Sequence, residues 1–180
     1  DTVDFLLTAK RDKAAARRFL ERAIGLHDVP QKITIDKSGA NTAAIDDIKA
    51  DELMGIAYDS GINFFDNAEG YAHGESENMM GRVLKGKNWD RTSYILSSKV
   101  FFGSRKDSKP NQTGLSRKHI MEACHEAISR LQTDYLDLYF CHRPDPAVPI
   151  EEVVWTMHNL LSQCKVLYWG TSMWSAAEIM

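Results

Sequence analysis

The sequence has 180 residues, of which 43% are hydrophobic and 26% are charged, with a formal net charge of −3. This composition is typical of a soluble globular protein of roughly one domain. The small negative charge argues against nucleic-acid binding across the whole protein, and no apolar run approaches the roughly 18 residues of a membrane-spanning helix. Three cysteines without CxxC spacing argue against a disulfide framework or a zinc site. We therefore expect no metal and a reduced, cytoplasmic setting. Because the first residue is Asp, we also expect a processed product or a fragment.

The N-terminal part predicts a strand, a helix and a second strand, over residues 3–9, 12–25 and 31–36. In the helix, alanine and phenylalanine side chains recur on one face at helical spacing. Residues 37–50 then gather Gly, Ser, Asn and Thr, which are typical of loops and of domain boundaries.

A different sequence pattern begins near residue 47, where segments with helical periodicity alternate with segments typical of strands. The predicted helices cover residues 51–61, 75–86, 116–132 and 149–163, and the predicted strands cover 62–65, 93–100, 135–142 and 165–172. Strands that alternate with helices of this length indicate parallel βαβ units. An open doubly wound sheet and part of a (β/α)₈ barrel are both possible architectures, because periodicity alone does not distinguish them.

Polar side chains stand where each of these strands ends, which is where ligands bind in both architectures. The first strand leads to Asp66 with Tyr71 in its loop, the second ends at Lys99, the third at His142, and the fourth at Ser172. A phenol is a poor acid at neutral pH, but a neighbouring ammonium group stabilises its phenolate, and a carboxylate keeps that ammonium charged. An imidazole could hold a carbonyl oxygen beside the phenol. Together the set predicts proton delivery.

Each of these residues alone has a simpler interpretation, as a turn residue, a solvated side chain or loop packing, and only their joint placement favours function. Cys141 next to His142 raises the idea of a nucleophile and its base, but adjacent residues of a strand point to opposite faces. No GxGxxG and no Walker A sequence occurs, so neither Rossmann nor P-loop binding has a motif.

Several segments carry a family resemblance: "GINFFDNAEGYAHGESENMMGRVL", "SYILSSKVFFGS", "RLQTDYLDLYFCHRPDP" and "KVLYWGTS". They resemble aldo-keto reductases, in the branch that includes the potassium-channel β subunits. The resemblance implies a (β/α)₈ barrel that reduces aldehydes or ketones with NADPH, with a small-molecule carbonyl as substrate. It implies a catalytic tetrad of Asp66, Tyr71, Lys99 and His142, and contacts to the nicotinamide end of NADPH from Asp66, His142 and Ser172.

The same resemblance leaves a non-enzymatic alternative, an NADPH-sensing module similar to channel β subunits. Animal channel β subunits commonly have Asn where this chain has His142, which favours the enzyme. The resemblance covers about four βα units, whereas a full barrel typically needs about 250 residues. We therefore expect a partial barrel that self-associates through exposed edges and is not a competent reductase as given. The basic residues that hold the phosphates of NADPH would belong to the other units.

The N-terminal part of the sequence resembles a different family. "VDFLLTAKRDKAAARRFLERAIG" and "PQKITIDKSGANTAAI" are similar to DDE transposases of bacterial insertion sequences, which have a ribonuclease-H-like core. In that family three carboxylates hold two Mg²⁺ ions, and only Asp36 matches one of them here. We expect a transposase-like fragment over residues 1–46 without DNA-cleaving activity, followed by the N-terminal half of a reductase barrel over 47–180.

Overall fold

The computed structural model describes residues 39–180, and only the backbone of residues 39–47 and 49. The strand, helix and strand predicted before residue 37, together with Asp36, lie outside the described residues. Helix α2 spans Gly39–Asp59. The loop predicted over residues 37–50 is therefore wrong from Gly39 onward. Alanines recur through this stretch and no proline interrupts it, so its helix propensity outweighs the turn-forming residues at its start.

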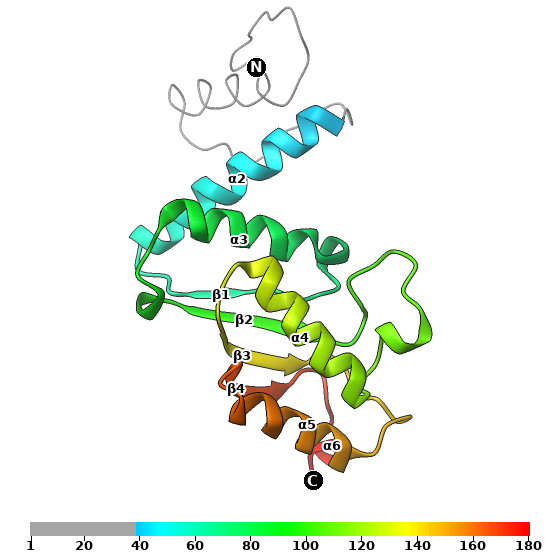
Figure 1. Ribbon diagram of the computed structural model, residues 1–180. Coiled ribbons are helices and arrows are strands. Elements are labelled where there is room, and N and C mark those ends of the chain that lie inside the picture. Colours follow the sequence, from blue (N-terminus) through cyan, green and yellow to red (C-terminus); the bar gives the residue numbers. More distant parts are fainter. Residues whose placement is uncertain (1–38) are drawn as a thin grey trace, which may run out of the picture. The chain divides into compact units, whose positions relative to one another are not determined.

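A four-stranded parallel sheet with strand order β1-β2-β3-β4 forms the centre of the fold (Figure 1). The strands are β1 (Phe64–Asp66), β2 (Ile95–Val100), β3 (Leu136–Cys141) and β4 (Val166–Thr171). The helices between and after them are α3 (Glu75–Lys87), α4 (Arg117–Leu131), α5 (Ile150–Ser162) and α6 (Ala176–Ile179), and the short 3₁₀ turns are η1 (Tyr71–Gly74), η2 (Arg91–Ser93) and η3 (Pro110–Gln112). The alternation of strands and helices predicted from residue 62 onward is confirmed.

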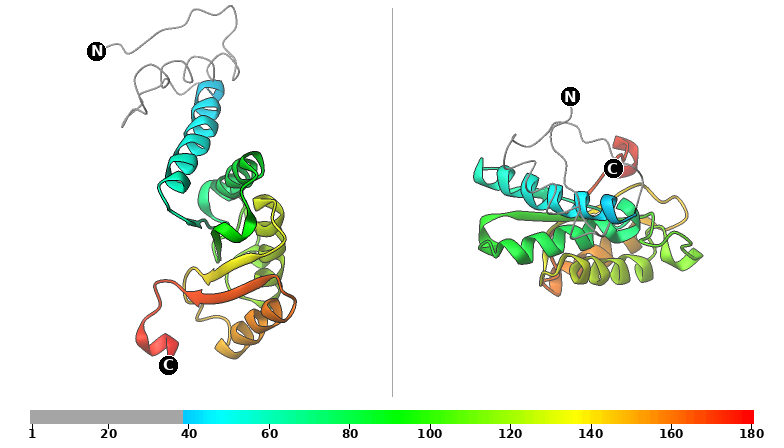
Figure 2. Two further views of the ribbon diagram at one scale, coloured as in Figure 1. Left: turned by 90° about the vertical axis from the view of Figure 1, so that its left-hand side faces the viewer. Right: turned by 90° about the horizontal axis from the view of Figure 1, so that it is seen from above.

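The three longer helices of this unit, α3, α4 and α5, lie on one face of the sheet (Figures 1 and 2). Ser116 caps α4, because its side chain accepts a hydrogen bond from the amide of His119. The core lies between these helices and the sheet. Its fully buried side chains include Leu96, Val100, Ile120, Ala127, Tyr139, Val153, Met157 and Leu160.

The strand register separates two faces of the sheet. Ser98 points to the helices, since its hydroxyl donates a hydrogen bond to Glu77 of α3. Lys99 is the next residue along the strand and therefore points to the opposite face. Large apolar side chains share that face and are exposed there, namely Phe64, Ile95 and Tyr168, with 45%, 39% and 68% of their surfaces accessible.

Contacts divide the chain into two compact units, Asp1–Ser60 and Gly61–Met180, and the sheet belongs entirely to the second. Among the helices that the structure describes, none combines the length and the apolar character needed to cross a bilayer.

Candidate active site

An ion pair joins the ends of the first two strands. Nζ of Lys99 on β2 lies 2.5 Å from Oδ2 of Asp66 on β1, and it also donates to the carbonyl oxygen of Asn67 at 2.8 Å. The other carboxylate oxygen of Asp66 accepts a hydrogen bond of 2.5 Å from the hydroxyl of Ser97. The Lys99 side chain is only 11% exposed, so a buried ammonium is held here by a partly exposed carboxylate.

The loop after β1 brings Tyr71 to the same place. The hydroxyl of Tyr71 lies 3.4 Å from Nζ of Lys99, and that ammonium is 5.0 Å from the centre of the Tyr71 ring. Tyr71 opens the turn η1, in which Ala72 and His73 take positive φ angles of 48° and 55°. Such angles are uncommon outside glycine, so the turn beside the phenol is strained.

His142 directly follows β3 and lies against aromatic side chains. Its ring centre is 5.8 Å from that of Tyr71 and 5.1 Å from that of Phe102, and both contacts are edge-on. His142 is buried, and its Nδ1 has no hydrogen-bond partner among the described residues. Burial, together with the positive charges of Lys99 and Arg143, lowers the pKa of His142 below its usual value of 6.5. These surroundings therefore favour the neutral imidazole over the charged form.

Ser172 follows β4 and is tied to the neighbouring strand, since its amide donates a hydrogen bond of 2.9 Å to the carbonyl oxygen of Cys141. Across residues 39–180 we find no hydrogen bond from the Ser172 side chain to the four other predicted site residues. The structure thus brings Asp66, Tyr71, Lys99 and His142 into one cluster and leaves Ser172 at its border.

Two residues beside this cluster were missed by the sequence reasoning. Glu69 is 2% exposed and accepts hydrogen bonds from the backbone amides of Phe101 and Gly103. Phe102, between those two amides, places its ring against His142. The sequence offers no local signal for either, because a glutamate in a polar loop is usually solvated.

Cys141 lies on the helix side of the sheet, paired in register with Val100, while Lys99 and Phe140 face the other way. Burial raises the pKa of Cys141 to about 12. A thiol with this pKa is not an activated nucleophile, which agrees with the geometric argument from the sequence.

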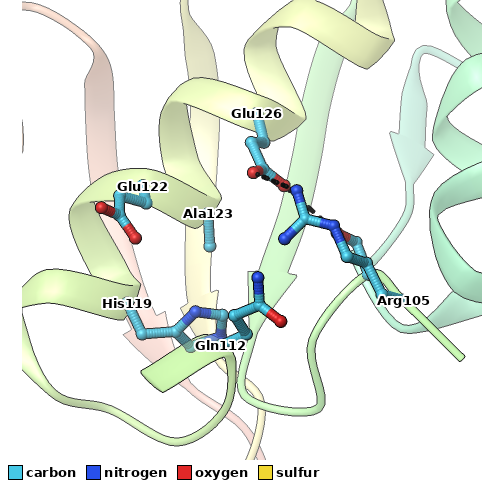
Figure 3. Close-up of a pocket in the computed structure, with 7 residues that line it drawn as sticks. Arg105, Gln112, His119, Glu122, Ala123 and Glu126 are labelled. Carbon is cyan, nitrogen blue, oxygen red and sulfur yellow. Dashed lines mark hydrogen bonds and ion pairs between the residues drawn. The ribbon is translucent and has the colours of Figure 1, made fainter. Parts of the chain in front are cut away.

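A separate small hollow of about 30 Å³ lies between α4 and the loop that follows β2 (Figure 3). Its lining is polar and consists of Ser104, Arg105, Gln112, His119, Glu122, Ala123 and Glu126. None of the four clustered residues lines it. Its acidic and basic side chains already have partners within the protein, since Arg105 and Glu126 form an ion pair of 3.1 Å across it and Glu122 pairs with Lys118.

Comparisons with known protein families give two matches along the chain. The sequence model of the aldo/keto reductase family matches residues 36–180, and that of a DDE domain matches residues 1–60. The two matches overlap over residues 36–60, the region of α2.

A curated protein named putative voltage-gated potassium channel subunit beta, from Schizosaccharomyces pombe, is 51% identical over 123 residues. The match covers 68% of this chain and 36% of that protein. Among solved structures, the holo form of aldo-keto reductase AKR11C1 from Bacillus halodurans aligns with a TM-score of 0.62 and 32% identity, over 70% of this chain and 41% of that one. The chain thus spans well under half the length of these relatives, and the predicted partial barrel is confirmed.

Proposed function

The chain belongs to the aldo/keto reductase family, and on that premise we propose that it carries the catalytic residues of an NADPH-dependent reduction of aldehydes or ketones to alcohols. One observation carries the proposal. The buried ammonium of Lys99 contacts both the carboxylate of Asp66 and the hydroxyl of Tyr71. This is the arrangement that a phenol needs in order to give a proton to a carbonyl oxygen near neutral pH.

Each residue has a role that follows from its contacts. Tyr71 donates its hydroxyl proton to the carbonyl oxygen of the substrate. Lys99 stabilises the phenolate that this transfer leaves behind, and Asp66 keeps Lys99 charged and in place. The neutral His142 holds the carbonyl oxygen beside Tyr71 through a ring nitrogen.

NADPH, when bound, supplies a hydride to the carbonyl carbon, which completes the reduction to an alcohol. The residues at the strand ends fit the nicotinamide end of such a cofactor. A carboxamide offers both a donor and an acceptor, and Nδ1 of His142 is buried without a partner among residues 39–180. The half-exposed carboxylate of Asp66 and the Ser172 hydroxyl would complete these contacts. The choice of NADPH over NADH belongs to the proposal.

The second candidate is a module that binds NADPH without turnover, and the likeness to a protein named as a potassium channel β subunit favours it. His142 favours the enzyme, since an imidazole can hold and polarise a carbonyl oxygen. For the DDE-like part no activity is proposed, because Asp36 is a single carboxylate and a two-metal site needs several.

Self-association is part of the proposal. Phe64, Ile95 and Tyr168 form an exposed apolar surface on the face of the sheet that carries Lys99. Exposed apolar surfaces of this kind favour burial against another chain. Sedimentation velocity should show oligomers that Tyr168→Glu weakens, and a monomer at all concentrations would contradict this part.

The test of the reductase proposal measures reduction of 4-nitrobenzaldehyde by the purified chain with NADPH. Reduced nicotinamide mononucleotide, which lacks the adenosine phosphates, serves as a second hydride donor. We expect turnover below that of an eight-stranded reductase, and a loss of about 100-fold or more in Tyr71→Phe. Tyr58→Phe on α2 is the matched control and should keep the wild-type rate.

Turnover that is equal in wild type and Tyr71→Phe would overturn the assignment of Tyr71. Binding of NADPH, measured by its fluorescence, without turnover dependent on Tyr71 would favour the non-enzymatic module.

A further inference from the structure

The ring of His142 is held by its neighbours in an unusual way. A functional histidine is commonly oriented by a hydrogen bond to its second ring nitrogen. Here Nδ1 of His142 is buried and no described protein group bonds to it. The described contacts of the ring are instead edge-on packing against Phe102 at 78° and against Tyr71 at 81°. The orientation of the imidazole therefore depends on where these two rings stand.

Phe102 cannot hold its own place by burial, because 48% of its surface is exposed. Its ring also contacts Phe101 and lies 5.6 Å from the guanidinium carbon of Arg143. A single oxygen binds the backbone amides on both sides of it, while the carbonyl oxygen of Phe101 accepts a hydrogen bond of 2.7 Å from the amide of Gly114. Oε1 of Glu69 accepts hydrogen bonds of 2.7 Å from the amide of Phe101 and of 3.0 Å from the amide of Gly103.

Glu69 is itself firmly anchored. Its Oε1 also lies 3.1 Å from Nε2 of His119 in the first turn of α4, and both side chains are almost fully buried. Its own amide donates to the carbonyl oxygen of Lys99 at 3.1 Å. Glu69 thus connects the loop after β1, the loop after β2 and α4 at one point. The far end of the β2 loop is tied separately, by Asp145 to the amide of Leu115 at 2.8 Å.

We propose that Glu69 is a positioning residue for the carbonyl-binding side of the site. By holding the amides of Phe101 and Gly103, it fixes the Phe102 ring, and the Phe102 ring in turn fixes His142 beside Tyr71. The importance of these contacts for catalysis rests on the proposed reductase function. The contacts themselves are independent of that function. A buried carboxylate that accepts several hydrogen bonds is well suited to this task, because charge-assisted bonds resist loosening.

The consequence for substrates follows from geometry. The carbonyl oxygen has to meet both the Tyr71 hydroxyl and the His142 imidazole, and small misplacements at such a site lower rates strongly. Loss of the Glu69 anchor would leave Asp66, Lys99 and Tyr71 intact while His142 loses its fixed orientation.

The experiment uses nuclear magnetic resonance on the full chain and needs no turnover. Nuclear Overhauser effects between the Phe102 ring protons and the His142 imidazole protons report their contact, with the His142 signals assigned from their absence in His142→Asn. The variants are Glu69→Ala, Glu69→Gln and, as a matched control, Glu77→Ala. Glu77 is an equally buried glutamate that bonds to Ser98 and Arg130 but not to the β2 loop.

We expect the Phe102–His142 effect to disappear in Glu69→Ala, to persist in Glu77→Ala, and to return in Glu69→Gln, whose amide oxygen still accepts from both backbone amides. Persistence of the effect in Glu69→Ala would overturn the proposal. If Glu69→Ala does not fold, hydrogen exchange of the Phe101 and Gly103 amides in Glu69→Met, which keeps the length of the side chain but offers no oxygen acceptor, decides instead. Exchange at least 10-fold faster than in Glu77→Met supports the proposal, and equal rates contradict it. Turnover that does not depend on Tyr71 would reject the reductase proposal and leave these readouts unaffected.

Discussion

Gly81 of α3 packs directly against the carbonyl oxygen of Arg130 at the end of α4. A Cβ atom at position 81 would lie 2.2 Å from that oxygen, closer than any side-chain carbon can approach. The two helices therefore touch through backbone, with no side chain between them. Because the turn that carries Tyr71 leads directly into α3, this contact also anchors the helix behind the candidate site.

We expect Gly81→Ala to destabilise the fold by about 2–3 kcal/mol, since the cost of overpacking exceeds the gain in helix propensity. Gly86→Ala is the matched control in the same helix, because a Cβ atom there would meet nothing within 4 Å. It should stabilise the protein by up to about 1 kcal/mol. Urea unfolding of both variants measures the difference, and similar effects at the two positions would disprove the close packing.

The lowered pKa of His142 predicts a dependence of stability on pH. The folded-state pKa lies below the unfolded value near 6.5, so the unfolded chain binds more protons as the pH falls through that value. This contribution to stability is complete above pH 6.5 and is lost toward acid. Its slope is at most about 1.4 kcal/mol per pH unit.

Urea unfolding of the wild type and His142→Gln between pH 7.5 and 5 isolates this contribution, because the other titrating groups are common to both proteins. We expect the wild type to lose more stability than the variant as the pH falls. Parallel curves would show that His142 is not held neutral by its surroundings.

Much of this fold could be read from local pattern. The spacing of apolar residues predicted α4 to within a residue at each end, and the parallel strands followed from their alternation with helices. Since all parallel strands end at one edge, the same reasoning predicted that Asp66, Lys99 and His142 lie near each other. Their roles in catalysis stay a prediction.

Glu69 was missed because its deciding contacts are distant in sequence. Glu69 reads as a solvated loop residue, yet its partners are the amides of Phe101 and Gly103 and the ring of His119. At α2 the error was local, because turn-forming residues at its start were given more weight than the helix formers that follow.

The three thiols should differ in reactivity. Burial raises the pKa of both Cys124 and Cys141 to about 12, whereas Cys164 is exposed. The native chain should therefore react with one equivalent of Ellman's reagent, and the denatured chain with three. Cys164→Ser should remove the native reaction entirely. Rapid reaction of a second thiol in the native state would support the idea that Cys141 is an activated nucleophile.

The last prediction concerns the boundary between the two pieces, which we place near residue 47 from the sequence. The compact units divide after Ser60, where α2 has ended and Gly61 adopts a φ of 90°, with nothing within 4 Å of the place where a Cβ atom would lie. Ile62 is 54% exposed beside it. A protease cuts most readily in an exposed segment outside helices and strands, which residues 60–62 offer and the interior of α2 does not.

Limited digestion with thermolysin, which cuts before large apolar residues, should therefore release a resistant fragment that begins at Ile62 and contains the whole sheet. Ile62→Asp is the control and should suppress this cut without altering the sheet. Mass spectrometry of the resistant fragment identifies its first residue. A fragment that begins near residue 47 would instead support the boundary drawn from the sequence. It would mean that α2 unfolds locally and is cut before the Gly61–Ile62 bond. Early cleavage inside residues 64–171 would contradict both boundaries, since it would mean that the four-stranded unit is not the stable part of the chain.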